Sequence, residues 1–145
     1  CCIGKKGSTN NKKEADKKTP KGTFKIENLY FREDRTKKPL TLLKCIKIKK
    51  NMGWCDDVSF PEKYNKLIKI EKKIRHEKLK RKDNKYDLLI PIKYNFKKPI
   101  AGMGSCIFIH LTKNYNPTAG CIALKEKDFL IMLKLINKDS KIKIF

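Results

Sequence analysis

At 145 residues the chain has the length of one ordinary domain, and we interpret residues 1–145 as a single domain. Apolar residues make up 39% and charged residues 36%, which indicates a globular protein with a heavily charged surface. No stretch reaches the roughly 18 consecutive apolar residues that a membrane-spanning helix needs, and no signal-peptide pattern is visible. The net charge of +22 would suit a nucleic-acid partner, but only four of the 37 basic residues are arginine, so we expect an anionic polymer bearing carboxylates instead.

The first half of the chain predicts few regular elements. Because Cys1 stands in place of Met and residues 2–4 read as a strand end, we interpret the chain as a fragment lacking its first strands; a processed lipoprotein is the alternative. Residues 5–22 are typical of an ordered loop, whereas alternation predicts strands at 23–26 and 43–48. Residues 51–61 predict an irregular segment with Trp54 as an aromatic anchor, and residues 66–82 predict a partly helical one.

The second half is more regular. Apolar runs predict buried strands at 86–92 and 106–109, and a short apolar run at 121–124 follows a turn. Apolar residues at helical spacing predict one amphipathic helix over about 125–138, and alternation at 141–144 predicts a closing strand. The pattern as a whole predicts a mainly β fold with one helix.

Six cysteines and two histidines are present. They form no C-x-x-C pair, so we do not expect a structural metal site, and disulfide connectivity is not deducible from the sequence. We expect most of the cysteines to be small buried apolar groups.

The most informative window contains His110 and Cys121. His110 closes an apolar strand, and Cys121 follows Gly120 in a turn where successive N–H groups can point at one spot. Thiol acyl transfer needs such an arrangement, with a base for the thiol proton and fixed donors for the oxyanion. From spacing alone we favour a core histidine and a buried cysteine, because both residue types are common in one domain.

The residues around this window resemble the catalytic signature of the L,D-transpeptidase (YkuD-type) family, a histidine followed by Ser/Thr-x-Gly-Cys. Here the signature is His110 with Thr118-Ala119-Gly120-Cys121. Residues 19–24, Thr-Pro-Lys-Gly-Thr-Phe, resemble the family's Thr-Pro-x-Gly-x-Phe strand entry. Matches to one bacterial branch are Gly53-Trp54-Cys55-Asp56-Asp57, Tyr64-Asn65, Tyr86-Asp87 and Gly104-Ser105 leading into Ile107-Phe108-Ile109-His110.

The chain also departs from the commoner family pattern. Ala119 stands where a histidine precedes the Gly-Cys pair, and Ala123 stands where an asparagine follows the cysteine. Leu111 follows the histidine, so only its backbone carbonyl is available to orient the imidazole. These changes keep the nucleophile and the base but leave the choice of acceptor open.

The resemblance implies a β-rich, sandwich-like domain and a two-step reaction in bacterial cell-wall biogenesis. Cys121 attacks the third residue of a peptidoglycan stem tetrapeptide and expels the terminal D-alanine, with His110 as base and then acid. The backbone N–H groups of Gly120 and Cys121 are the candidate oxyanion donors. An amine of another stem then gives a cross-link, or water gives carboxypeptidase activity, with no metal or organic cofactor. Location in the cell envelope or periplasm follows from this substrate.

Other residues are weaker candidates. Trp54, Asp56, Asp57, Tyr64 and Asn65 are expected to line the donor groove; the alternative is a core anchor and a loop shaped by the aspartates. Thr118 either assists the site or bonds within its turn, and Arg81 either meets a stem carboxylate or is solvated. We expect His76 at the surface and Cys106 in the core.

Two other functions remain as alternatives. One is a non-catalytic basic module that binds an anionic cell-wall polymer or nucleic acid. The other is a cysteine hydrolase that acts on other peptides or amides.

Overall fold

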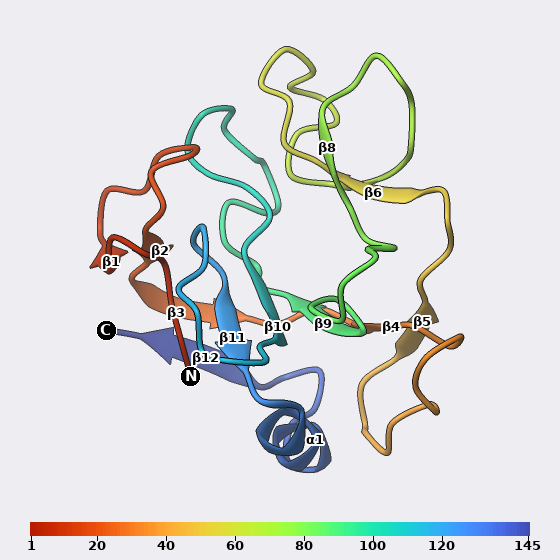
Figure 1. The fold of residues 1–145 in the computed structure, drawn as a ribbon. Coiled ribbons are helices and arrows are strands. Elements are labelled where there is room, and N and C mark those ends of the chain that lie inside the picture. Colours follow the sequence, from red (N-terminus) through yellow and green to blue (C-terminus); the bar gives the residue numbers. More distant parts are fainter.

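A five-stranded mixed sheet occupies the middle of this computed structural model, which describes all residues 1–145 (Figure 1). Its strand order is β11-β10-β9-β4-β5, with parallel pairs at the two edges and antiparallel pairs between them. The strands are β4 (Leu29–Phe31), β5 (Cys45–Lys47), β9 (Leu88–Pro91), β10 (Phe108–Leu111) and β11 (Ile122–Leu124).

Three smaller sheets surround the central one. The first pairs β3 (Gly22–Lys25) with β12 (Lys141–Ile144), the second has β6 (Met52–Cys55) between β7 (Leu67–Lys69) and β8 (His76–Lys78), and the third pairs β1 (Ser8–Thr9) with β2 (Thr19–Pro20). In Figure 1 the β6 and β8 region lies above β9, and the β1 and β2 region lies on the opposite side near both termini. The single helix α1 (Glu126–Leu135) lies below the sheet. The prediction of a mainly β fold with one helix is confirmed.

Alternation along the central strands divides the core into two clusters, one on each face of the sheet. The larger cluster packs against Phe129 and Leu133 of α1, and its sheet residues are Leu29, Phe31, Leu88, Ile90, Ile109, Leu111 and Ile122. The smaller cluster lies on the opposite face and contains Tyr30, Ile48, Trp54, Leu79, Tyr86, Leu89, Phe108 and Cys121. The candidate nucleophile therefore belongs to the face that does not carry the helix.

Local patterns predicted several elements well, with shifted ends. α1 covers ten residues of the predicted 125–138, because Ile136 has an extended backbone (φ −104°, ψ 155°). β10 begins at Phe108 and not at Cys106, because Cys106 has a φ of +53° that no β-strand accommodates. No helix is long and apolar enough to cross a lipid bilayer.

Three predictions were wrong. Residues 66–82 form no helix; they supply β7 and β8, which pair with the two edges of β6, and their buried residues Ile74 and Leu79 have no helical repeat. Residues 51–61 are not irregular throughout, since β6 begins there. Of the six free cysteines only Cys55 and Cys121 are buried, so the expectation that most are core residues fails.

Residues near the N-terminus run along the outer edge of β11. Cys2 and Ala123 exchange two backbone hydrogen bonds of 2.9 Å, and Lys5 N–H donates to the Thr118 carbonyl at 2.9 Å. This segment therefore covers the strand that begins directly after the candidate nucleophile.

Candidate active site

The pairing of β10 with β11 brings His110 and Cys121 to the same face of the sheet. The two strands run parallel, with Ile109 opposite Ile122 and His110 opposite Ala123. Cys121 precedes Ala123 by two residues, so its side chain points to the side that His110 faces. The Phe108 N–H donates to the Cys121 sulfur at 3.4 Å, which links the start of β10 to the candidate nucleophile.

His110 is held in one tautomer by its neighbour. The imidazole is only 6% exposed, and its Nδ1 lies 2.8 Å from the Leu111 carbonyl oxygen, which accepts only if Nδ1 carries the proton. Burial lowers the pKa of His110. The ring is therefore neutral near pH 7, with Nε2 unprotonated and able to accept a proton. The Leu111 carbonyl thus orients the imidazole, as its position next to the histidine suggested.

Cys121 is a neutral thiol in this arrangement. Its side chain is buried and its sulfur donates to the Cys106 carbonyl oxygen at 3.1 Å. Burial raises the pKa of the Cys121 thiol to about 12. No hydrogen bond joins the thiol to the imidazole, a common situation in sites without substrate. The resting site is therefore a neutral pair and not a thiolate-imidazolium ion pair.

The turn before Cys121 is fixed by Thr118. Its hydroxyl accepts from the Gly120 N–H at 3.1 Å and donates to the Cys121 carbonyl at 2.6 Å. Gly120 has a φ of +144°, and a Cβ there would lie 2.9 Å from the Lys18 carbonyl oxygen, so the turn requires glycine. Of the two N–H groups expected to hold an oxyanion, that of Gly120 is already bonded, and that of Cys121 makes no hydrogen bond within the chain.

Asn65 supports the segment that binds the thiol. Its Oδ1 accepts from Trp54 Nε1 at 3.0 Å and from the Cys106 N–H at 3.1 Å. Its Nδ2 donates to the carbonyls of Tyr94 and Asn95 at 3.0 and 2.7 Å. Because the Cys106 carbonyl accepts the Cys121 thiol, Asn65 fixes the position of the sulfur through one intervening residue.

Cys121 lies where two cavities meet. The first, of about 300 Å³, is lined by His110 and by the cationic residues Arg81, Lys85 and Lys113; we call it the basic cavity. The second, of about 240 Å³, is lined by Glu14, Asp56 and Glu77 together with Lys12; we call it the acidic cavity. The two share the lining residues Glu77, Tyr86, Ala119 and Cys121.

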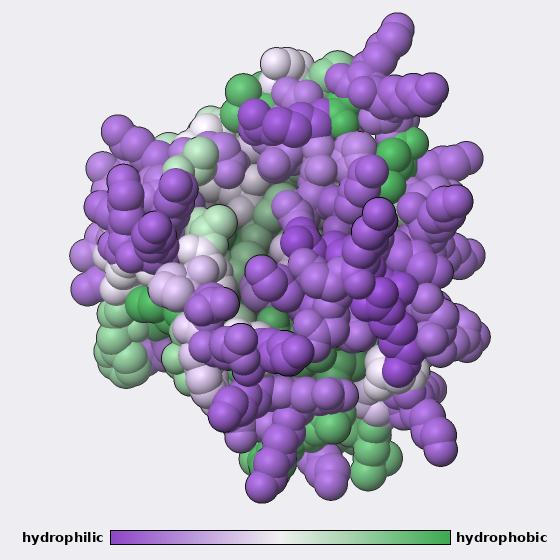
Figure 2. All heavy atoms as spheres, viewed as in Figure 1, coloured by the Kyte–Doolittle hydropathy of each residue, from purple (hydrophilic) through white to green (hydrophobic).

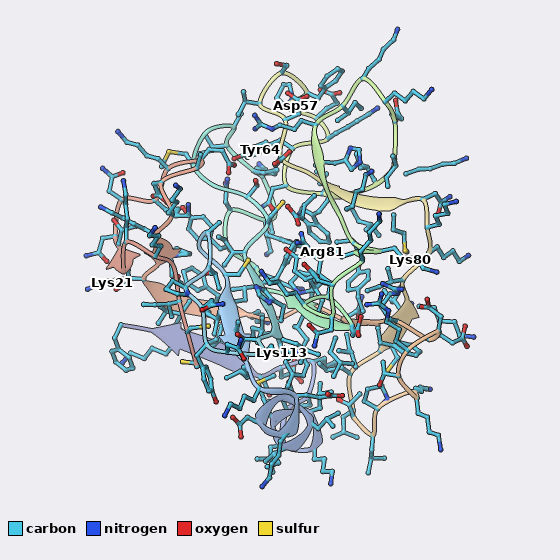
Figure 3. The ribbon with its side chains drawn as sticks, viewed as in Figure 1. Lys21, Asp57, Tyr64, Lys80, Arg81 and Lys113 are labelled. Carbon is cyan, nitrogen blue, oxygen red and sulfur yellow. The ribbon has the colours of Figure 1, made fainter.

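Figures 2 and 3 view the molecule from the same side. Figure 2 shows a hollow near the middle of the viewed face, with paler residues at its floor and hydrophilic side chains around it. In Figure 3 Arg81 and Lys113 lie close to the centre of the view, Tyr64 lies above it and Asp57 lies farther out at the top.

The structure brings only some of the predicted site residues together. Cys121 lines both cavities, His110 and Thr118 line the basic one, and Gly120 and Asp56 line the acidic one. Trp54, Asp57, Tyr64 and Asn65 line neither. Trp54 packs against Phe108 with ring centroids 5.4 Å apart, and the Asp57 carboxylate accepts from the N–H groups of Ser59 and Arg75, at 3.0 and 2.9 Å.

Two residues at the site were assigned no role from the sequence. Tyr86 is 7% exposed, its ring packs against His110 at 5.3 Å, and its hydroxyl makes no hydrogen bond within the chain. Glu14 accepts hydrogen bonds from Ser105 Oγ at 2.7 Å and from the Tyr64 hydroxyl. Tyr86 stands in one of the matched motifs, whereas Glu14 lies in a segment whose composition indicated only a loop.

A comparison with protein families decides the relationship. The profile of the YkuD family, described as the L,D-transpeptidase catalytic domain, matches residues 1–144. The chain belongs to the L,D-transpeptidase (YkuD) family. No curated protein and no solved structure gives a match. In this L,D-transpeptidase family domain Ala119 lines both cavities at Cys121, so the position before Gly120 offers a methyl group and no imidazole.

Proposed function

We propose that this domain is a peptidoglycan L,D-transpeptidase that uses Cys121 as nucleophile and His110 as base and acid. The observation that carries the proposal is the position of Cys121 at the junction of two cavities, on the sheet face shared with a histidine whose Nε2 is unprotonated. Family membership supports acyl transfer as the reaction class.

In the first step the Cys121 sulfur attacks the carbonyl of the third stem residue. The sulfur–carbon bond forms while the thiol proton passes to His110 Nε2, because the resting pair is neutral. The Cys121 N–H is the free backbone donor for the oxyanion. When the carbon–nitrogen bond breaks, His110 returns its proton to the leaving nitrogen and D-alanine departs.

In the second step the thioester is attacked by an amine or by water. The attacking atom loses a proton to His110 Nε2, the carbon–sulfur bond breaks, and the sulfur regains a proton. In both steps His110 carries the proton between the Cys121 sulfur and the attacking or leaving atom.

The basic cavity suits the donor peptide. Lys85 and Lys113 line it without forming an ion pair, so their charges are available to carboxylates of a stem. Arg81 is already engaged with Glu77 at 2.6 Å and Asp83 at 2.8 Å, and lies 5.0 Å from the Tyr86 ring centre. The main role of Arg81 is therefore to stabilise the lining of the basic cavity through its ion pairs, and not to bind substrate. Peptidoglycan as substrate places the protein in the cell envelope.

The proposal is tested by incubating the protein with a muropeptide that carries a stem tetrapeptide. We expect D-alanine release from the wild type and from Cys45→Ala, a matched control because Cys45 lines neither cavity. We expect no release from Cys121→Ala or His110→Gln. Failure of the folded wild type to release D-alanine would favour the non-catalytic basic module, and equal cleavage of ordinary L-peptides would favour the general cysteine hydrolase.

A further inference from the structure

We propose that the acidic cavity binds the acceptor as a primary ammonium ion, and that Glu14 is the residue that selects this amine over water. The inference rests on the proposed acyl-transfer function and names the subsite of its second step. It makes the domain a transferase in preference to a hydrolase.

The lining of the acidic cavity is unusual for this protein. The chain carries a net charge of +22, yet Glu14, Asp56 and Glu77 all face this cavity. The one cation in the lining, Lys12, is bonded to Asp16 at 2.6 Å and to the Lys13 carbonyl at 2.7 Å. A positively charged ligand is therefore attracted to this cavity, whereas most of the surface repels it.

Glu14 differs from the other two carboxylates in having no cationic partner. Asp56 pairs with Arg75 at 3.1 Å and Glu77 pairs with Arg81 at 2.6 Å. Glu14 forms no ion pair: its Oε2 accepts from two neutral hydroxyls, those of Ser105 and Tyr64, and its Oε1 accepts from the Ala15 N–H at 3.3 Å. Its orientation is fixed while its charge remains unneutralised, which is the arrangement that a fixed ammonium site requires.

Glu14 also lies close to the nucleophile through a short structural connection. Ser105 donates to Glu14, and the next residue, Cys106, accepts from the Cys121 thiol at 3.1 Å. The dipeptide Ser105-Cys106 therefore connects the Glu14 carboxylate to the Cys121 sulfur, and all four residues line the acidic cavity. Tyr86 adds a second, independent sign of a ligand, because this residue lines the same cavity, is only 7% exposed, and its hydroxyl makes no hydrogen bond within the chain.

The acceptor step balances as follows. The bound ammonium loses one proton to solvent, and its nitrogen attacks the thioester carbonyl. The new carbon–nitrogen bond forms, the carbon–sulfur bond breaks, and a second nitrogen proton passes through His110 Nε2 to the Cys121 sulfur. The products are an amide and the free thiol, and no other reactant is needed.

A structural role is the competing interpretation of Glu14, in which it only ties the N-terminal segment to Tyr64 and Ser105. Glu14→Gln separates the two, because an amide oxygen still accepts a hydrogen bond but carries no charge. The matched control is Glu62→Gln, an exposed glutamate that lines neither cavity.

The experiment measures three products from one donor muropeptide and an amine acceptor: D-alanine, the amide and the hydrolysed stem. For Glu14→Gln we expect the ratio of amide to hydrolysed stem to fall at least about tenfold, since a charge-assisted contact is lost. Glu62→Gln should keep the wild-type ratio. An unchanged ratio of amide to hydrolysed stem for folded Glu14→Gln would overturn the inference about Glu14 while leaving acyl transfer intact. Failure of the folded wild type to release D-alanine would overturn both the inference and the proposed function.

A second measurement does not depend on the variant folding. In the wild type, a trimethylammonium analogue of the acceptor cannot attack the thioester but keeps the positive charge. We expect it to compete with the amine and to be displaced by the amine. The N-acetylated neutral analogue should not compete, and equal inhibition by both analogues would contradict a charge-selective site.

Discussion

The Nδ1 of His110 donates to the carbonyl oxygen of Leu111 at 2.8 Å, and this bond sets the protonation pattern of the whole site. It leaves Nε2 as the only ring atom that can take a proton. Burial lowers the pKa of His110 and raises that of Cys121 to about 12, so near pH 7 neither group is charged. The thiol and the imidazole are therefore both uncharged in the protein without substrate.

A neutral resting pair predicts slow thiol alkylation at neutral pH. Because the pKa of Cys121 is raised, its thiolate fraction is small at pH 7 and grows as the pH rises toward about 12. We expect the iodoacetamide reaction of Cys121, followed by peptide-resolved mass spectrometry, to speed up across the alkaline range. Exposed Cys1 serves as the internal reference. A fast, pH-independent reaction from about pH 5 upward would instead indicate an ion pair.

Asn65→Ala should both destabilise the fold and impair the site. The change removes an amide that makes four hydrogen bonds, two of them to the buried Trp54 indole and to the Cys106 N–H. We expect a loss of about 2–4 kcal/mol in the free energy of unfolding, measured by urea denaturation. Asn51→Ala is the control, because the Asn51 side chain is exposed and makes no hydrogen bond. A change below about 0.5 kcal/mol would contradict the assigned role.

Thr118→Val should show whether the Thr118 hydroxyl, and not the volume of the side chain, holds the turn before Cys121. Valine keeps the shape but loses the hydroxyl that accepts from Gly120 and donates to the Cys121 carbonyl. We expect D-alanine release to fall by roughly 10- to 100-fold, because the nucleophile and its free N–H shift relative to the substrate. Thr118→Ser retains the hydroxyl and should recover most of the rate. If valine and serine behaved alike, the hydroxyl would have no part in the turn.

Tyr86→Phe should test whether the unpartnered hydroxyl contacts substrate. The ring still packs against His110 and Phe108, at 5.3 and 5.8 Å in the native protein, so the melting temperature should change little. We expect kcat/KM to fall about tenfold through loss of one hydrogen bond to the bound peptide. Tyr30→Phe, at a buried tyrosine that lines neither cavity, should have wild-type activity. Unchanged kinetics for Tyr86→Phe would limit Tyr86 to packing.

The elements that the sequence predicted correctly are those with a strong local pattern. Helix α1 and strands β3 and β12 carry their own apolar period, and β9 is a continuous apolar run, so local sequence decides their conformation with little help from the rest of the chain. Strands β7 and β8 have no such period, since both exist because β6 offers two unpaired edges. The charged residues between them were mistaken for a helix because lysine and glutamate are good helix formers.

The residues of the candidate site were likewise predicted only in part from the sequence. His110 and Cys121 were predicted from motif residues, and the parallel register of β10 and β11 explains why they face one side. Trp54 and Asn65 belong to the same motifs, yet they line neither cavity at Cys121, and Asn65 bonds to the Trp54 indole and to the Cys106 N–H, an arrangement that only packing reveals. Glu14 meets Ser105 across 91 residues, and no local pattern predicts such a contact.

The most direct test of the central claim is intact-protein mass spectrometry of the enzyme mixed with a donor tetrapeptide muropeptide and stopped in acid. We predict a covalent adduct equal to the donor minus D-alanine, located on Cys121 by peptide mapping, labile to hydroxylamine and absent in Cys121→Ala. An adduct on another cysteine, or D-alanine release without any dependence on Cys121, would contradict the account.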